Sequence, residues 1–318
     1  MKKVLVVGEI LIDLVEGKDG FKASIGGAPF NVAYNLSSLG DDVTFVGQVG
    51  DDYFGNLILN SLKGKKNLNL NIEKLNERNT TIALNVDDSG KRKYSFIRKN
   101  TADYAFNLEK INSLDISKFN LIHIGSLFLS NADSRKVISV LTERAKKLNI
   151  PVSFDVNLRT DIFDENTNIL NIYNSFIESA DLIKFSDEET PFFFNGLSQR
   201  EIFNKINAKC LLITEGSKGS SLITKDAIIT HTSFKVKVKD TVGAGDSFYS
   251  GFLHAYLNLD DVNNQNLNGA LEFASACGAL TCLKDGAING YKSEKDVYKF
   301  INDRAITKKD FLFFNFNK

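Results

Sequence analysis

Short apolar runs alternate with amphipathic helical patterns through the middle of this chain. In order, the runs and the patterns lie at residues 121–125, 134–148, 152–155, 168–179, 182–185, 198–206 and 210–214. Strands that alternate with helices in this way form βαβ units, whose strands lie parallel in one sheet. We therefore predict an α/β fold with a doubly wound, mostly parallel sheet flanked by helices. In such a fold, ligands bind beyond the carboxyl ends of the strands.

Two segments, near residues 11–25 and 80–105, interrupt this alternation. Both alternate apolar and polar residues, and they carry turn signals at Lys18-Asp19-Gly20 and Asp87-Asp88-Ser89-Gly90. This pattern is typical of antiparallel strands with one solvated face, and the basic run Lys91-Arg92-Lys93 fits a hairpin tip. We predict a small antiparallel β lid built from two insertions, within a single domain that spans residues 1–318. The aromatic tail at 311–316 fits either a terminal strand or a docking segment.

Composition excludes several classes of function. The chain has 39 basic and 39 acidic residues and no net charge, so it lacks the basic surplus of a nucleic-acid-binding protein. No apolar stretch is long enough to span a membrane, and the three scattered histidines suggest no transition-metal site. The three cysteines form no Cys-x-x-Cys pair, and they are expected to be reduced thiols in a cytoplasmic protein.

A glycine-rich turn followed by a carboxylate carries the strongest chemical signal. Gly243-Ala244-Gly245 precedes Asp246 and a run with helical spacing at residues 247–256. The first N–H groups of a helix bind anions, whereas a carboxylate placed there can accept a proton. The alternative is an ordinary helix N-cap, and the absence of Gly-Lys-Ser/Thr excludes a Walker A loop. Anion site and base together indicate phosphoryl transfer to a hydroxyl group.

Further polar clusters follow the predicted strands. Asp13 and Asn31 suit the hydroxyl groups of a polyol, and Gly26 and Gly27 let the backbone approach a small ligand closely. Arg159, which follows the strand at 152–155, offers a forked donor for phosphoryl oxygens. Each residue alone has a structural explanation as a turn, loop or surface residue. Their joint occurrence in this order favours a binding site.

Two stretches resemble the signatures of the ribokinase-like, or pfkB, family of carbohydrate kinases. Residues 26–33 with their continuation to residue 55 are similar to the N-terminal signature, and residues 240–246 are similar to the C-terminal one. The resemblance extends from Gly8 to about Ala287. It implies a doubly wound α/β sandwich with a β lid that transfers the γ-phosphate of ATP to a sugar hydroxyl. It also implies Mg²⁺ brought by ATP and a monovalent cation such as K⁺. The oligomeric state stays open at this point, and an apolar lid face would favour a homodimer paired through the lid across a two-fold axis.

The resemblance also assigns roles to residues of this chain. Asp246 would be the general base, the N–H groups of Gly243, Ala244 and Gly245 the anion hole, and Arg159 a phosphate contact. Asp13, Gly27 and Asn31 would hold the sugar, with Asn157 nearby. The ATP site would be lined by Thr214, Gly216, Gly219, Ala274, Gly278, Gly286 and Ala287.

Metal positions follow from the same resemblance. Asp240 and the carbonyl group of Val242 would bind the monovalent cation. Glu189 ends a motif in which relatives usually carry Asn-x-x-Glu, but here Ser186 replaces the asparagine. Serine is shorter and lacks the amide, so metal or phosphate positioning there would be looser or carried through water.

Three stretches, at residues 8–13, 96–103 and 123–126, resemble those of fructokinases and predict D-fructose as the acceptor, phosphorylated at O6. Arg98 would descend from the lid to the substrate; the alternative is an exposed lid arginine. The nearest rival substrate is 2-keto-3-deoxygluconate, whose carboxylate Arg98 could contact, although Asp103 would place a negative charge close by. A sugar-binding sensor without catalysis is the alternative from another class. Intact Asp246 and its turn argue against the sensor, and Ser186 alone favours it.

Overall fold

The computed structural model describes residues 1–314 except 18, 19, 89 and 90. Its main sheet has nine strands in the order β13-β12-β11-β10-β9-β8-β1-β4-β5, and every pair from β11 to β5 is parallel. Only β12 and β13 join it antiparallel. The strands are β1 (Lys3–Val7), β4 (Asp42–Gly50), β5 (Leu68–Leu75), β8 (Leu121–Ile124), β9 (Val152–Asp155), β10 (Leu182–Ser186), β11 (Cys210–Thr214), β12 (Ser220–Ile223) and β13 (Ile228–His231). The predicted fold class is confirmed.

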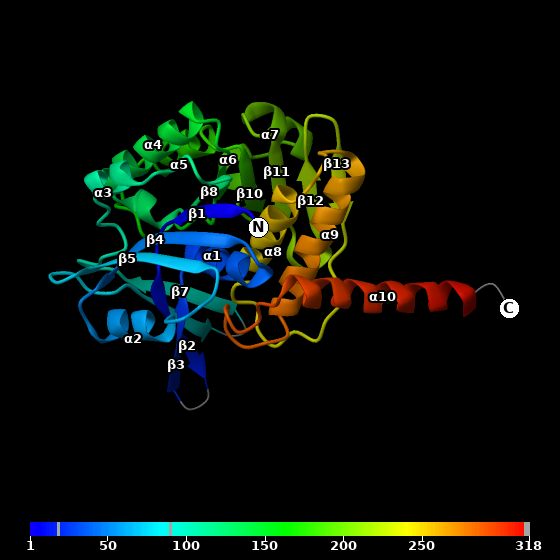
Figure 1. Cartoon of the computed structure of the whole chain (residues 1–318), viewed down its shortest axis with the longest axis horizontal. Coiled ribbons are helices and arrows are strands. Elements are labelled where there is room, and N and C mark those ends of the chain that lie inside the picture. The colour runs from blue at the N-terminus through cyan, green and yellow to red at the C-terminus, as the bar shows by residue number, and fades with distance from the viewer. Residues whose placement is uncertain (18–19, 89–90, 315–318) are drawn as a thin grey trace.

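Helices cover both faces of this sheet, as Figure 1 shows. The helices are α1 (Ala28–Leu39), α2 (Tyr53–Ser61), α3 (Leu108–Ser113), α4 (Ala132–Lys147), α5 (Ile169–Ile177), α6 (Thr190–Phe194), α7 (Gln199–Lys205), α8 (Ala244–Leu257), α9 (Asn264–Thr281) and α10 (Glu294–Phe314). Three of them, α4, α5 and α7, match the patterns predicted at 134–148, 168–179 and 198–206 within two residues. Ser198 and Glu201 form a capping box at the start of α7, which satisfies N–H groups that have no partner within the helix.

Strand β1 shows why the strands read as continuous apolar runs. Leu5 and Val7 belong to the core beneath α4 and α5, whereas Val4 and Val6 belong to the core beneath α1 and α8. All four side chains are fully buried. A parallel sheet covered on both faces therefore requires apolar residues at every position rather than at alternate ones.

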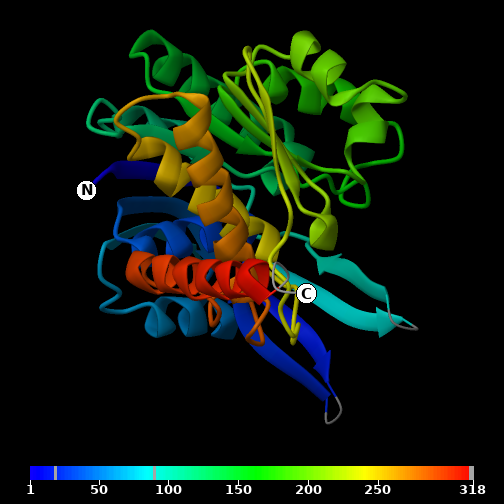
Figure 2. The same cartoon turned by 90° about the vertical axis from the view of Figure 1, so that its right-hand side faces the viewer.

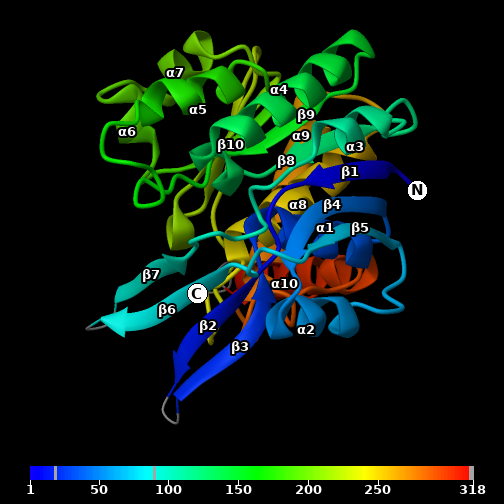
Figure 3. The ribbon, with the colours of Figure 1, turned by 90° about the vertical axis from the view of Figure 1, so that its left-hand side faces the viewer.

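The lid is a separate four-stranded sheet in the order β3-β2-β6-β7. Its strands are β2 (Leu11–Gly17), β3 (Gly20–Gly26), β6 (Ile82–Asp88) and β7 (Lys91–Ile97). Each hairpin is antiparallel as predicted, but the two hairpins meet in a parallel β2–β6 pair. Both project from the body of the molecule (Figures 2 and 3). Residues 18–19 and 89–90 of the predicted turns lie outside the described residues, and Lys91-Arg92-Lys93 opens β7.

The C-terminal segment does not form the terminal strand that was one of the two alternatives for it. Residues 311–314 continue α10, which runs out from the body in Figure 1; residues 315–316 of the aromatic tail lie outside the described part of the chain. Among the described residues, no helix is both long and apolar enough to cross a bilayer. The three cysteines are free thiols.

Candidate active site

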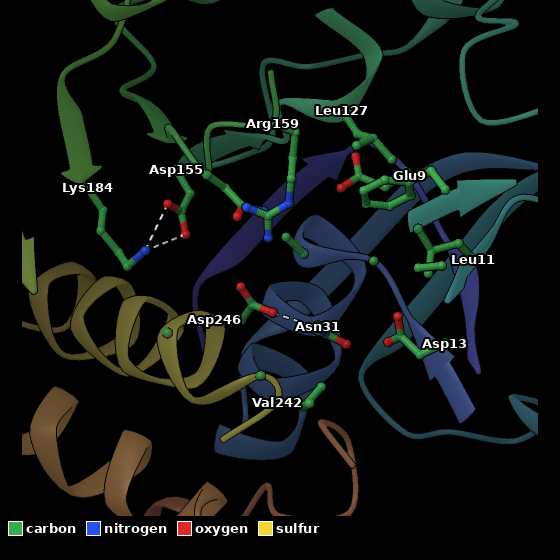
Figure 4. Close-up of a pocket in the computed structure, with 17 residues that line it drawn as sticks. Glu9, Leu11, Asp13, Asn31, Leu127, Asp155, Arg159, Lys184, Val242 and Asp246 are labelled. Carbon is green, nitrogen blue, oxygen red and sulfur yellow. Dashed lines mark hydrogen bonds and ion pairs between the residues drawn. The ribbon is translucent and has the colours of Figure 1, made fainter. Parts of the chain in front are cut away.

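A polar cavity of about 220 Å³ opens between the lid and the carboxyl ends of the strands. Figure 4 shows side chains from the lid and from the main part of the molecule pointing into this cavity. Nine of the predicted site residues line it: Asp13, Gly27, Asn31, Asn157, Arg159, Val242, Gly243, Gly245 and Asp246. Its wall also contains residues to which the sequence assigned no role: Glu9, Leu11, Ala28, Ala83, Phe96, Leu127, Asp155 and Lys184.

Asp246 lies in the first turn of α8, directly after the glycine-rich turn. Its Oδ2 accepts a hydrogen bond of 2.7 Å from Nδ2 of Asn31 on α1. Burial raises the pKa of Asp246 above that of an ordinary aspartate, while the Asn31 bond and the charges of Lys184 and Arg159 oppose the rise. A carboxylate of raised pKa is a better proton acceptor near neutral pH. Asn31 thus orients the group that the sequence predicts as the base.

The turn before Asp246 requires glycine at position 243. Gly243 caps α8 with φ of 76°, in the left-handed region that favours glycine. A Cβ there would lie 2.5 Å from Cβ of the buried Ala287. The turn is therefore held against a fixed neighbour, and its N–H groups keep a defined position at the positive end of the helix.

A buried ion pair, Lys184 with Asp155, faces the same turn. Lys184 Nζ lies 2.9 Å from both carboxylate oxygens of Asp155, and the side chains are 8% and 3% exposed. Burial alone would lower the pKa of Lys184, but the carboxylates of Asp155 and Glu189 raise it, so the ammonium keeps its charge. A Cβ on Gly245 would lie 3.7 Å from Nζ. This cation and the start of α8 together form an anion site.

Asp13 enters the cavity from the lid strand β2. It is 7% exposed, and burial, together with the nearby Asp246 and Asp240, raises its pKa to about 7. Gly26 does not line the cavity. A Cβ there would lie 1.9 Å from Asp13 Oδ2, so Gly26 makes room for the Asp13 carboxyl group. Gly27, which caps α1 with φ of 107°, does line the cavity.

A second cavity of about 450 Å³ lies on the other side of the turn. Its walls include the predicted residues Thr214, Gly216, Gly219, Ala244, Gly245 and Gly278. Phe234, Val236 and Val238 add an apolar side that suits a nucleotide base. Gly245 is the residue that lines both cavities. The anion turn is therefore the boundary between them.

Three residues predicted for the ATP site line neither cavity among the described residues. Ala274 is buried in the core shared by α8 and α9. Gly286 donates its N–H to Asp240 Oδ2 at 2.9 Å, and Ala287 packs against Gly243. Gly286 and Ala287 therefore support the turn from behind, and Ala274 belongs to the core. A linear motif does not distinguish residues that support a site from residues that contact its ligand.

Residues predicted as metal ligands are engaged with the backbone. Glu189 accepts N–H groups from Leu158 at 2.7 Å and from Ser186 at 2.6 Å, which joins the ends of β9 and β10. Asp240 accepts N–H groups from Val242 and Gly286 at 3.0 and 2.9 Å. In the part of the chain that the structure describes, no group of three or more His, Cys, Asp or Glu could hold a metal ion.

Arg98 is held away from the polar cavity. Its Nε and Nη2 contact Asp103 Oδ2 at 2.7 and 2.6 Å, Nη1 donates to Ser130 Oγ at 2.6 Å, and Nη2 also donates to the Leu127 carbonyl group at 2.9 Å. The alternative of an exposed lid arginine is wrong, because the side chain is 9% exposed. The structure does not bring Arg98 to the cavity wall; it braces Leu127, which does line the cavity.

Two cavities that meet at a helix start bearing a carboxylate define a phosphotransferase that acts on a hydroxyl group. Residues 1–294 match the model of the pfkB family carbohydrate kinases, and the chain belongs to this family. It is an ATP-dependent sugar kinase.

Relatives and solved structures agree with this assignment. The chain is 33% identical over 315 residues to a probable chloroplastic fructokinase-6 of Arabidopsis thaliana, covering 93% of this chain and 81% of that protein. It is 30% identical over 308 residues to a fructokinase of Vibrio alginolyticus, covering 95% and 99%. The crystal structure of a Xylella fastidiosa fructokinase with bound ATP superposes with a TM-score of 0.89 at 28% identity, covering 95% and 99%. A double mutant of the Vibrio cholerae O395 fructokinase, in its fructose, ADP and potassium ion bound form, superposes with a TM-score of 0.86 at 27% identity. This match covers 94% of this chain and 98% of that chain.

Proposed function

We propose that the sugar is D-fructose, that the product is fructose 6-phosphate, and that Mg²⁺ accompanies ATP. The observation that carries the chemistry is that Gly245 lines both cavities while the adjacent Asp246 lines the polar one. A hydroxyl group beside Asp246 then faces a phosphoryl group across the turn. Support for fructose comes from the relatives, which are named as fructokinases, and from a related structure with fructose and ADP.

The proposed mechanism assigns one task to each group. Asp246 accepts the proton of the sugar O6 as this oxygen attacks the γ-phosphorus, and Asn31 keeps the carboxylate oriented. The N–H groups of the turn at Gly243–Gly245 and the Lys184 ammonium stabilise the negative charge on the phosphoryl oxygens. Arg159, on the cavity wall, adds a guanidinium on the same side. Asp13 and Asn157 hold the remaining hydroxyl groups.

Two cations are part of the proposal. When ATP is bound, Mg²⁺ would neutralise charge on the β- and γ-phosphates, and Glu189, which follows β10, would help to hold it. K⁺ would bind by Asp240 and the Val242 carbonyl group, next to the turn. Support for K⁺ comes from the related structure that contains a potassium ion. Because Asp240 already ties Val242 to Gly286, the cation would act by stabilising the shape of the turn.

The position of Arg98 removes the argument for the acidic rival substrate. The Arg98 guanidinium is already bound to Asp103, and Arg98 does not line the cavity. A 2-keto-3-deoxygluconate carboxylate would therefore lack the cation that was expected to bind it. The inactive-sensor alternative has little support, because the base and the anion turn are both in place around the cavity.

We also propose a lid-mediated homodimer, a single kinase domain and a cytoplasmic location. The register of the lid strands puts Phe21 and Ile97 on the face opposite Asp13. These two side chains are 52% and 56% exposed, and a two-fold partner would cover such a face. Analytical ultracentrifugation of the wild type and of Phe21→Ser with Ile97→Ser tests the dimer. An unchanged sedimentation coefficient in the variant would contradict it.

The test of the proposed function is ADP release from Mg-ATP with fructose, ribose and 2-keto-3-deoxygluconate, with and without K⁺. We expect turnover with fructose, a phosphorus NMR signal for the 6-phosphate, and stimulation by K⁺. Omission of the sugar is the control for background ATP hydrolysis. Turnover confined to the acidic sugar would refute the substrate, and no turnover with any sugar would favour the sensor.

A further inference from the structure

Glu9 is a buried acid in the wall of the sugar cavity to which the mechanism above gives no task. It lies just beyond the end of β1, is 2% exposed, and lines the cavity. Its Oε2 has no hydrogen-bond partner in the part of the chain that the structure describes. Buried polar atoms nearly always have a partner. An unpartnered oxygen at the wall of a ligand cavity therefore indicates that the ligand supplies the partner.

The backbone around Glu9 is shaped to accommodate its carboxyl group. A Cβ on Gly125 would lie 2.9 Å from Glu9 Oε2, and a Cβ on Gly27 would lie 2.6 Å from the Glu9 carbonyl oxygen. Side chains at these positions would push Glu9 out of place. The two glycines come from different parts of the chain, one after β8 and the other before α1. Gly125 thus leaves room for the carboxyl group, and Gly27 leaves room for the backbone that carries it.

An ion pair with Arg98 does not explain Glu9. The four polar contacts of the Arg98 guanidinium go to Asp103, Ser130 and the Leu127 carbonyl group. Every one of its nitrogens has a partner among these groups. The charged groups that influence Glu9 are Asp103, Arg98 and Asp246, and two of these three are negative. Glu9 is therefore an isolated acid and not one half of a salt bridge.

Burial raises the pKa of Glu9 to about 8; its own backbone and Arg98 oppose this rise, whereas Asp103 and Asp246 add to it. At neutral pH the side chain is then largely the neutral acid, which carries an O–H donor. A neutral donor can bind a sugar oxygen without the cost of burying a charge. The neutral acid is consistent with the unpartnered Glu9 Oε2 at the cavity wall, and that observation does not depend on the protonation state.

We propose that Glu9 is a specificity-determining residue of the sugar site and hydrogen-bonds a sugar oxygen at the end of the cavity away from Asp246. The inference rests on the proposed fructose kinase activity. In Figure 4, Glu9 and Asp13 lie on one side of the cavity, while Asp246 and the Lys184–Asp155 pair lie on the other. When O6 of fructofuranose is beside Asp246, the oxygens on C1 and C2 lie at the opposite end of the ring. Glu9 binds one of these two.

The experiment compares kcat/KM for fructose, 1-deoxyfructose and 2,5-anhydromannitol, which lacks the hydroxyl group on C2. The enzymes are the wild type, Glu9→Gln, Glu9→Met and a matched control, Gln48→Met. Gln48 is also buried with an unpartnered oxygen among the described residues, but it does not line the sugar cavity. In the wild type, we expect one analogue to be about 10-fold poorer than fructose, since leaving a buried hydrogen-bonding group unsatisfied costs about this much.

In Glu9→Met, kcat/KM for fructose should fall by the factor that separates fructose from the poorer analogue in the wild type. This variant should then turn over fructose and that analogue equally well. Glu9→Gln, which keeps an N–H donor, should retain most of the discrimination, and Gln48→Met should behave as the wild type. The Tm of Glu9→Met should be unchanged or higher, because an unpartnered buried acid is replaced by an apolar group of similar size. Equal discrimination by the wild type and Glu9→Met would overturn the proposal. A lower Tm with all sugars affected equally would assign Glu9 a structural role and overturn it as well.

Failure of the proposed substrate would be visible separately. Wild-type enzyme that is inactive with fructose but active with another sugar would refute fructose alone. The Glu9 proposal would then be decided by single-deoxy analogues of the accepted sugar. Sugar-dependent increases of Tm in the wild type and in Glu9→Met give a second readout that requires no turnover.

Discussion

Replacing Asp246 with asparagine should separate catalysis from binding. Asn31 Nδ2 holds Asp246 Oδ2 at 2.7 Å, and the single amide oxygen of an asparagine can accept the same hydrogen bond. The α1–α8 contact and the anion turn should therefore survive. What is lost is the proton acceptor, which is worth about 100- to 10,000-fold in kcat. This factor corresponds to ~3–5 kcal/mol of transition-state stabilisation, with little change in KM for either substrate.

The same substitution should stabilise the protein. Burial raises the pKa of Asp246 in the folded state, so ionising it at pH 7 costs folding free energy that an uncharged amide does not. Coupled ADP-release kinetics and thermal unfolding at pH 7 measure the two effects on one sample. Asp133→Asn, at an exposed site on α4, is the control and should change neither. A loss of kcat below 10-fold, or a loss confined to KM, would refute Asp246 as the base.

Three further predictions concern the surroundings of the site. Folding stability should fall as pH rises from about 4 to about 8. Folding raises the pKa of Glu9 to about 8 and of Asp13 to about 7, so the folded state binds more protons than the unfolded state in this range. A Tm that rises from about pH 4 to about pH 8 would contradict this prediction. Gly243→Ala should lower the free energy of unfolding by more than Gly64→Ala, measured in urea, since both have φ near 75° but only position 243 has a close neighbour; equal losses would show that the contact is unimportant. Lys184→Met should lower the free energy of unfolding by about 3–5 kcal/mol, because it leaves the buried Asp155 carboxylate unpaired, and it should also lower kcat. If the variant unfolds in urea with the same free energy as the wild type, the ion pair is not a structural element.

The fold was accessible from the sequence because its elements are locally encoded. Continuous apolar runs indicated strands buried on both faces, and the alternation at 11–25 and 80–105 indicated the lid hairpins. The parallel pairing of β2 with β6 could not be anticipated, because it joins segments about seventy residues apart along the chain with no turn between them. The end of α10 was also missed, because an aromatic run has no periodicity that excludes a strand.

Some residues of the site could likewise be predicted from the sequence, and others could not. Asp246, Asn31 and Asp13 follow predicted strands or begin predicted helices, where a polar residue indicates a binding site. All three line the cavity. Lys184 was overlooked because it lies inside an apolar strand, although a lysine in a buried strand is itself a signal. Arg98 is the opposite case, a residue singled out from the sequence that does not line the cavity. Its sequence context suggested a ligand contact, but three protein groups across the fold already bind it.

The attachment of Asp13 to the lid has a mechanical consequence. This carboxyl group belongs to β2 in the small sheet, whereas Asp246 belongs to α8 in the main body. A sugar held by Asp13 would therefore be positioned by the lid, whereas its acceptor hydroxyl group would give up its proton to a carboxylate of the main body. A rotation of the lid would then displace the acceptor oxygen relative to its base, so the orientation of the lid would govern the transfer. Water would not be held by Asp13 in this way, so placing sugar binding and proton transfer on separate units would limit ATP hydrolysis in the absence of sugar.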